Sequence, residues 1–179
     1  DKFNPKQIII DCSQAFFSRP YQCLATIYSP RKFFGIPDGG LIFTSQKIQP
    51  PNLQDTDSVF RMEHLITRLA ISAEAGYASY KVAEASLDNH TPKIMSRLTS
   101  KLLKSIDYET IQEKRINTFL KLSDFFQEEN QLNIDLNTTT PLCYPLLSDK
   151  KINRDIFSKN KIFFPTYWID AASRVKTNS

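Results

Sequence analysis

The sequence predicts an α/β protein in two parts: a mixed sheet that belongs to a large domain, followed by a small α+β C-terminal domain. Three observations predict this arrangement. The first forty-five residues contain three apolar runs that do not alternate with polar residues, which is typical of strands covered on both faces. Amphipathic helical patterns begin only at Asp57. A polar turn near residue 90 then separates residues 1–90 from residues 91–179.

The predicted strands are Gln7 to Cys12, Cys23 to Tyr28, and Gly40 to Thr44, and the first run ends with Asp11. Strands that are apolar on both faces need helices above and below the sheet. The sequence has no helical pattern before residue 57 to supply them. We therefore expect the covering helices to lie in chain outside this sequence, which would then be a fragment of a longer protein.

A polar connector that contains two prolines, residues 45–56, leads into one long predicted helix from Asp57 to about Leu87. Gly76 is expected to weaken this helix by about 1 kcal/mol relative to alanine without ending it. The helix is predicted because apolar side chains recur at steps of three and four. These positions are Met62, Leu65, Ile66, Leu69, Ala73 and Tyr77.

The second half begins with a looser helical stretch at residues 94–103. Asp107 is a good N-cap for a second clear helix that ends near Glu129. Its apolar stripe consists of Ile111, Ile116, Phe119, Leu120 and Phe126. The tail then predicts a strand at residues 142–147, a helix at 153–159 and a strand at 161–164.

Composition narrows the function classes. Hydrophobic residues make up 41% of the chain, enough for a packed core, and the net charge of +4 comes without a basic stripe, so no nucleic-acid partner is expected. No apolar run approaches a membrane span, and no signal-peptide pattern occurs. Three scattered cysteines fit free thiols in the cytoplasm better than disulfides or zinc. His64 and His90 lack neighbouring ligands, so no metal site is expected.

The residues with candidate chemistry follow the first two strands. Asp11 and then Gln14 come at the end of the first, and Ser29 and Lys32 come directly after the second. Ligands of open α/β sheets gather at the carboxyl ends of parallel strands. If the two strands are parallel neighbours, Asp11 and Lys32 lie at the same edge, although roughly ten connecting residues are few for a parallel crossover.

This pair suits pyridoxal phosphate (PLP). A lysine amine forms a Schiff base with the cofactor aldehyde and later moves protons. A carboxylate keeps the pyridine nitrogen protonated, so that the ring accepts electrons. A hydroxyl three residues before the lysine, here Ser29, can reach the phosphate, and a nearby arginine can add charge.

The same residues resemble the DegT/DnrJ/EryC1/StrS family of PLP-dependent sugar aminotransferases, which have fold type I. The family's Asp-x-x-Gln-Ala motif is similar to Asp11, Gln14 and Ala15, and its lysine followed by an acidic residue and Gly-Gly is similar to Lys32 and Asp38-Gly39-Gly40. Weaker similarities lie at Arg61-Met62, Arg115 and the Pro165 to Trp168 segment.

The resemblance implies the C-terminal portion of a fold-type I enzyme, since family members are about twice this length. It implies that glutamate donates an amino group through PLP to a nucleotide-linked keto sugar, in the biosynthesis of surface polysaccharides or secondary metabolites. Lys32 would be the Schiff-base lysine and Asp11 the pyridinium partner. Gln14 would lie beside the ring, and the enzyme would be a cytoplasmic homodimer. The sequence departs from the family at Ile27, where a serine is usual, and at Val59, where an asparagine is frequent.

Two other functions fit parts of the sequence. Ser29-x-x-Lys32 matches the nucleophile motif of penicillin-binding proteins and β-lactamases, but the chain lacks their Ser-Asp-Asn and Lys-Thr-Gly motifs. The chain could also be a catalytically silent PLP-fold fragment that acts only in dimer assembly.

Overall fold

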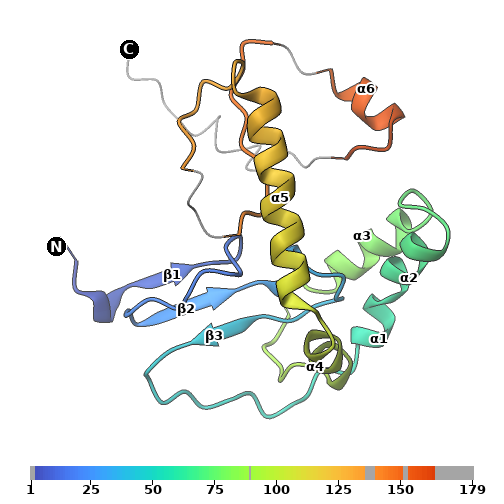
Figure 1. Cartoon of the computed structure of the whole chain (residues 1–179). Coiled ribbons are helices and arrows are strands. Elements are labelled where there is room, and N and C mark those ends of the chain that lie inside the picture. The colour runs from blue at the N-terminus through green and yellow to red at the C-terminus, as the bar shows by residue number, and fades with distance from the viewer. Residues whose placement is uncertain (1–2, 89, 136–139, 151–152, 164–179) are drawn as a thin grey trace, which may run out of the picture.

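A computed structural model of the chain describes residues 3–88, 90–135, 140–150 and 153–163. A three-stranded sheet lies beside a group of short helices, and the long helix α5 (Tyr108–Phe126) rises away from this layer (Figure 1). The strands are β1 (Ile9–Asp11), β2 (Ala25–Tyr28) and β3 (Leu41–Phe43), and they are hydrogen-bonded in that order.

The sheet is mixed. β1 and β2 run parallel, with Asp11 opposite Ile27, whereas β2 and β3 run antiparallel, with Tyr28 opposite Leu41. The arrows of β1 and β2 point toward the side of the molecule where the short helices lie (Figure 1). The parallel pair meets the condition on which the sequence argument for a common edge depended.

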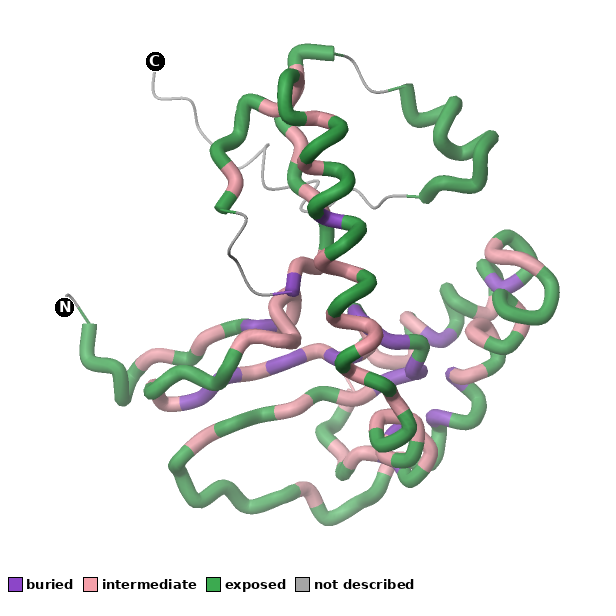
Figure 2. The backbone as a smooth tube through the Cα atoms, in the orientation of Figure 1, coloured by how far each residue is buried: buried purple, intermediate pink, exposed green. Residues whose placement is uncertain are grey.

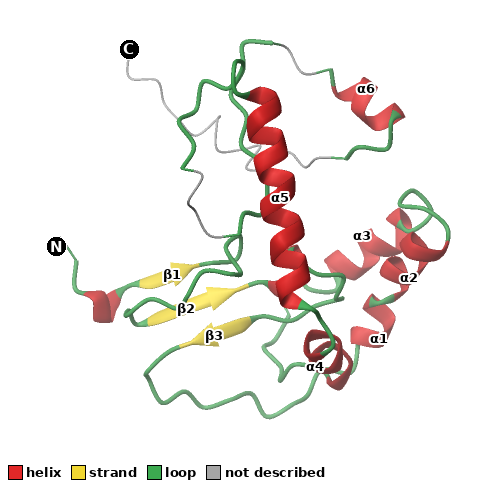
Figure 3. Cartoon of the chain, viewed as in Figure 1, coloured by secondary structure: helices red, strands yellow, loops and turns green. Residues whose placement is uncertain are grey.

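The connection between the parallel strands, residues 12–24, consists of turns and loops (Figure 3). Backbone hydrogen bonds fix both of its ends to the sheet. The Cys12 amide donates to the Ile27 carbonyl at 2.8 Å, and the Leu24 amide donates to the Ile8 carbonyl at 2.9 Å. A short 3-10 turn, η1 (Pro5–Gln7), precedes β1. The parallel crossover is thus made without a helix.

Burial differs between the central and the outer strands (Figure 2). Thr26 and Tyr28 of β2 are buried, whereas Ile9 of β1 is 60% exposed and Ile42 of β3 is 54% exposed. The expectation of strands buried on both faces is therefore correct for β2 alone. The outer strands each pair with one neighbour within the described sheet.

The prediction of one helix from Asp57 to Leu87 is wrong. The segment forms α1 (Ser58–Arg61), α2 (Glu63–Ala70) and α3 (Tyr77–Ala85). Gly76 is the N-cap of α3 rather than a mid-helix residue, and a Cβ atom built there would lie 2.7 Å from the His64 carbonyl oxygen. α3 therefore packs back against α2 at a distance that only glycine allows. The helix is therefore interrupted between Ala70 and Tyr77, where the chain turns to make this contact.

Of the next two helices, α5 begins where the sequence predicts, whereas α4 (Arg97–Lys104) begins three residues later than the predicted stretch at 94–103. Asp107 caps α5, since its side chain accepts a hydrogen bond from the Thr110 amide at 3.0 Å. Ser96 caps α4 by accepting from the Thr99 amide at 3.0 Å. Both caps satisfy amides that a helix leaves without a backbone partner.

An aromatic core lies between the sheet edge and the start of α5. Its buried members are Phe33, Phe34 and Ile36, which directly follow the 3-10 turn η2 (Pro30–Lys32). The Phe34 ring packs edge-on against Phe16, with centroids 4.8 Å apart, and edge-on against Tyr108 of α5 at 5.3 Å. Edge-to-face pairs of this kind add to the energy of apolar burial. The segment after Lys32 is thereby anchored.

The C-terminal part matches its prediction only in the helix. α6 (Arg154–Lys159) forms within the expected residues 153–159. Residues 142–147 and 161–163 are loops rather than strands, and residues 164–179 lie outside the described chain. Pro141 and Pro145 have no N–H to donate to a ladder, and the Pro145 carbonyl instead accepts from the Asn130 side chain at 2.9 Å.

Of the helices that the described residues form, none combines the length and the apolar character that crossing a membrane requires. All three cysteines are free thiols, as expected.

Candidate active site

The candidate site lies at the edge where the parallel strands end. β1 ends at Asp11, and β2 ends at Tyr28 just before the turn that carries Lys32. Because the two strands are parallel neighbours, their carboxyl ends lie at the same edge of the sheet, and Asp11 and the turn with Lys32 lie at that edge.

Asp11 is an ionised, solvent-exposed carboxylate. Its Oδ1 accepts hydrogen bonds from the Ser13 hydroxyl and, at 2.8 Å, from the Ser13 amide. These two bonds are the main reason why the pKa of Asp11 is lowered, and burial opposes them. The positive charge of Lys32 lowers the pKa as well, with the smallest effect of the four. Lys32 is thus near enough to interact electrostatically with Asp11.

Lys32 is the last residue of η2, and its side chain is exposed. The turn is fixed to the interior because Pro30 is fully buried and its carbonyl accepts from the amides of Phe33 and Phe34, at 2.9 and 3.0 Å. Ser29 precedes the turn, and its carbonyl accepts from the Lys32 amide at 3.2 Å. An exposed amine therefore stands on a well-anchored backbone.

Gln14 and Ser29 are half-buried near these residues in sequence. Within the described residues, neither side chain makes a hydrogen bond. The structure thus places Lys32 where its charge acts weakly on Asp11, without an ion pair between them. Neither residue is joined to Gln14 or Ser29 through a side-chain hydrogen bond.

A cleft of about 390 Å³ opens beside Lys32. Its polar lining comes from η2 on one side and from α2 and α3 on the other, whereas Asp11 does not line it. The residues that matter chemically are Arg31, Lys32, His64, Tyr80 and Glu84.

Arg31 and Glu84 form a bidentate ion pair across this cleft. Arg31 Nη2 donates to Glu84 Oε2 at 3.1 Å, and Nη1 donates to Oε1. The pair joins η2 to α3, although both side chains are about one-third exposed. Arg31 is therefore already matched by a carboxylate, which leaves less of its charge for a phosphate than the sequence suggested.

His64 and Tyr80 are cleft residues that the sequence analysis missed. Their rings meet edge-on, with centroids 5.4 Å apart. Burial lowers the pKa of His64, chiefly because the imidazolium loses hydration, so the ring is neutral at neutral pH. Both residues sit in ordinary helical patterns with no local motif. Only the α2–α3 turn, which the sequence did not reveal, brings them together.

Asp38 does not line the cleft, although the sequence groups it with Lys32. Its carboxylate is buried and accepts from Ser58 Oγ and Thr99 Oγ1, each at 2.6 Å, and from Arg61 Nη1 at 2.7 Å. The neighbouring Gly39 has φ +104°, and a Cβ there would lie 3.0 Å from the Thr99 methyl carbon. The Asp-Gly pair is thus explained by packing against α4.

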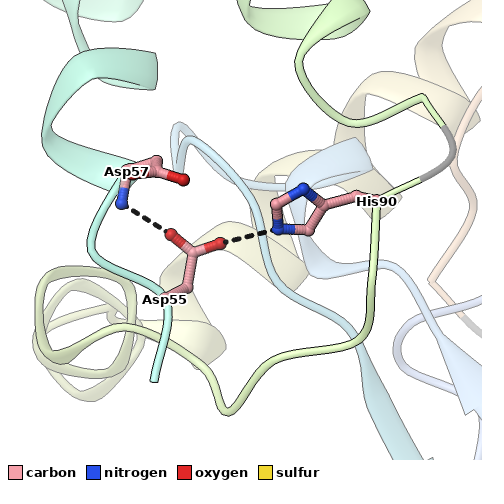
Figure 4. Close-up of side chains that lie close together, drawn as sticks. All are labelled: Asp55, Asp57 and His90. Atoms are coloured by element: carbon pink, nitrogen blue, oxygen red, sulfur yellow. Dashed lines mark hydrogen bonds and ion pairs between the residues drawn. The ribbon is translucent and has the colours of Figure 1, made fainter. Parts of the chain in front are cut away.

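A second polar cluster consists of Asp55, Asp57 and His90 (Figure 4). One ligand atom from each lies within 4.8 Å of the others, and His90 Nε2 is 3.6 Å from Asp55 Oδ2. Two cations already contact the carboxylates: Arg61 Nη1 lies 3.0 Å from Asp55 Oδ2, and Lys93 Nζ lies 3.2 Å from Asp57 Oδ2. The cluster is accounted for as an ion-pair network.

Comparisons of this chain with protein-family models, with curated proteins and with solved structures found no match. The residues and their geometry therefore carry the functional argument.

Proposed function

We propose that this chain is part of a PLP-dependent aminotransferase that passes an amino group from glutamate to a nucleotide-linked keto sugar, with Lys32 as the cofactor lysine. The observation that carries the proposal is the parallel pairing of β1 and β2, since it gives Asp11 and Lys32 a common edge. The electrostatic effect of Lys32 on the Asp11 pKa supports it further.

The donors at this edge fit the cofactor chemically. A protonated pyridine nitrogen needs an ionised carboxylate, and the hydrogen bonds from Ser13 keep Asp11 ionised. Only Oδ1 of Asp11 is engaged by Ser13, and Oδ2 has no hydrogen-bond partner among the described residues. Covalent attachment needs an accessible amine, and Lys32 supplies one beside a cleft.

PLP supplies an electron sink for the carbon that loses or gains the amino group. This chain's residues then have distinct tasks. Lys32 holds the cofactor and moves a proton at Nζ, and Asp11 keeps a positive charge on the pyridine nitrogen. In the proposal Gln14 borders the ring, and the Ser29 hydroxyl binds the phosphate.

The proposal includes a cytoplasmic homodimer, and the exposed apolar surface supports a partner subunit. Leu69 of α2 is 89% exposed, and Ile71, which follows α2, is 75% exposed. The same exposed side chains also favour the alternative, a silent fragment whose role is dimer assembly, so the test must detect cofactor chemistry itself.

Substoichiometric PLP is added to the chain, followed by borohydride, and the labelled lysines are located by peptide mass spectrometry. We expect a visible absorption band and a label concentrated on Lys32, both lost in Lys32→Ala and retained in Lys47→Ala, which removes another exposed lysine. Asp11→Asn should weaken the band. A label spread evenly over the surface lysines, or an unchanged band in Lys32→Ala, would leave the silent alternative.

A further inference from the structure

A second cleft, of about 340 Å³, lies on α5, and it shares only Leu142 with the described lining of the cleft beside Lys32. One wall is the face of α5 that carries Ile111, Phe119 and Leu122, and the other is the loop from Pro141 to Tyr144. These side chains make the interior largely apolar.

Among the described residues that line the cleft, the charged ones are both cationic, and none is an aspartate or a glutamate. They are Lys114, which is exposed, and Arg115, which is half-buried. Within the described part of the chain, neither cation forms an ion pair. Burial lowers the pKa of Arg115 because the guanidinium has lost hydration. A desolvated positive charge of this kind is stabilised by an anion.

The Arg115 guanidinium has N–H groups that are not used by its contacts with the described residues. Its Nη1 donates to the carbonyls of Pro141 and Leu142, at 3.4 and 3.2 Å, and its Nη2 donates to the Phe33 carbonyl at 3.3 Å. The guanidinium also lies over the Phe33 ring, 4.8 Å from its centroid. A guanidinium has five N–H groups. Three are engaged here, and one of the two that remain is on Nε, which has no partner among the described residues.

We propose that this cleft binds a small organic carboxylate with an apolar body, its carboxylate on Arg115 and Lys114 and its body against Ile111, Phe119 and Leu122. Charge complementarity selects the anion, because the described lining supplies two cations and no competing carboxylate. The apolar walls favour a ligand with an apolar part, because a small, fully hydrated anion buries no apolar surface against them. A planar carboxylate suits the two remaining donors of a guanidinium better than a compact ion does. This proposal does not rest on the proposed aminotransferase activity.

The test uses hexanoate as the probe and observes methyl chemical shifts of the whole chain during titration. We expect saturable shifts at Ile111, Thr118 and Leu122 in the millimolar range, as the size of the probe implies. Acetate has the same charge without the body, and hexylamine has the same body with the opposite charge. Both should bind at least about tenfold more weakly.

Lys114→Glu reverses one rim charge without touching the Arg115 contacts, and it should weaken hexanoate about tenfold. Lys121→Glu makes the same change on the same helix outside the cleft, and it should leave binding unchanged. Thermal melting of each variant checks that the fold is retained. Equal binding of hexanoate and hexylamine, equal losses in the two variants, or shifts centred on other methyl groups would overturn the proposal.

Discussion

Arg61 Nη1 lies 2.7 Å from Asp38 Oδ2, and this is the most deeply buried ion pair among the described residues, with side chains that are 1% and 9% exposed. Arg61 comes from α1, and Asp38 comes from the loop between the turn of Lys32 and β3. Asp55 and Ser86 also bind the same guanidinium. The pair therefore fastens the helical group to the sheet.

Replacing Asp38 by asparagine is expected to destabilise the protein by about 3 kcal/mol, because it removes one partner of a buried pair and leaves the other undercompensated. Urea unfolding would measure the change. Asp57→Asn is the matched control, since Asp57 is 51% exposed and its nearest contact to Arg61 is 3.7 Å. Its effect should stay below about 1 kcal/mol. Equal losses would mean that burial of the pair is unimportant.

Gly76→Ala is expected to destabilise the protein by about 2 kcal/mol. The new methyl group would lie 2.7 Å from the His64 carbonyl oxygen and 3.3 Å from the Arg68 amide nitrogen, both of which are backbone atoms held in α2. The backbone must move, so α2 and α3 must separate. Gly35→Ala is the control, because a Cβ at Gly35 meets no atom within 4 Å, and its effect should be within about 0.5 kcal/mol. Thermal or urea unfolding compares the two, and equal effects would argue against the close packing of α2 and α3.

Some features of the fold could be predicted from the sequence, and others could not. Asp107 and the start of α5 were predictable because a cap acts over three residues. The turn at Gly76 was not, because the helical periodicity continues through it and the cause of the break is a contact with His64, twelve residues away. The Asp38–Arg61 pair joins residues that the sequence assigned to separate motifs, and no local pattern records that they meet.

The candidate site likewise has one part that the sequence predicted and one part that it did not. The order of Asp11 and Lys32 along two apolar runs predicted a common edge, which needs only that the strands be parallel neighbours. Three other residues of the cleft, Glu84, His64 and Tyr80, lie beside Lys32 only because α3 folds back against α2. The apolar periodicity predicted one continuous helix there, so it could not bring these residues together.

Acid is expected to weaken the fold through Asp55. Burial opposes ionisation of this carboxyl, but hydrogen bonds from the Asp57 amide and from Arg61 outweigh it, so its pKa in the folded state is lowered from 3.8. In the unfolded chain the value returns to about 3.9. The unfolded state therefore binds the proton more tightly, and the stabilisation is complete above that pKa and is lost as the pH falls through it toward the folded value.

Urea unfolding between pH 6 and pH 3 would measure this effect. The free energy of unfolding should fall more steeply for the native chain than for Asp55→Asn, and the two curves should converge at the acid end. Parallel curves would show that Asp55 does not contribute.

Glu84→Gln is expected to loosen the segment that carries Lys32. The substitution keeps the size of the side chain but removes the charge that holds Arg31, and Arg31 is the residue directly before Lys32. Global stability should change by less than about 1 kcal/mol, because both side chains are about one-third exposed. Amide hydrogen exchange at residues 31–34 should nevertheless become faster, since α3 no longer restrains the turn. Glu113→Gln, on the exposed face of α5, is the control and should leave this exchange unchanged. If the two variants exchange alike at residues 31–34, then the buried Pro30, Phe33 and Phe34 hold the turn by themselves, and the ion pair has no part in positioning Lys32.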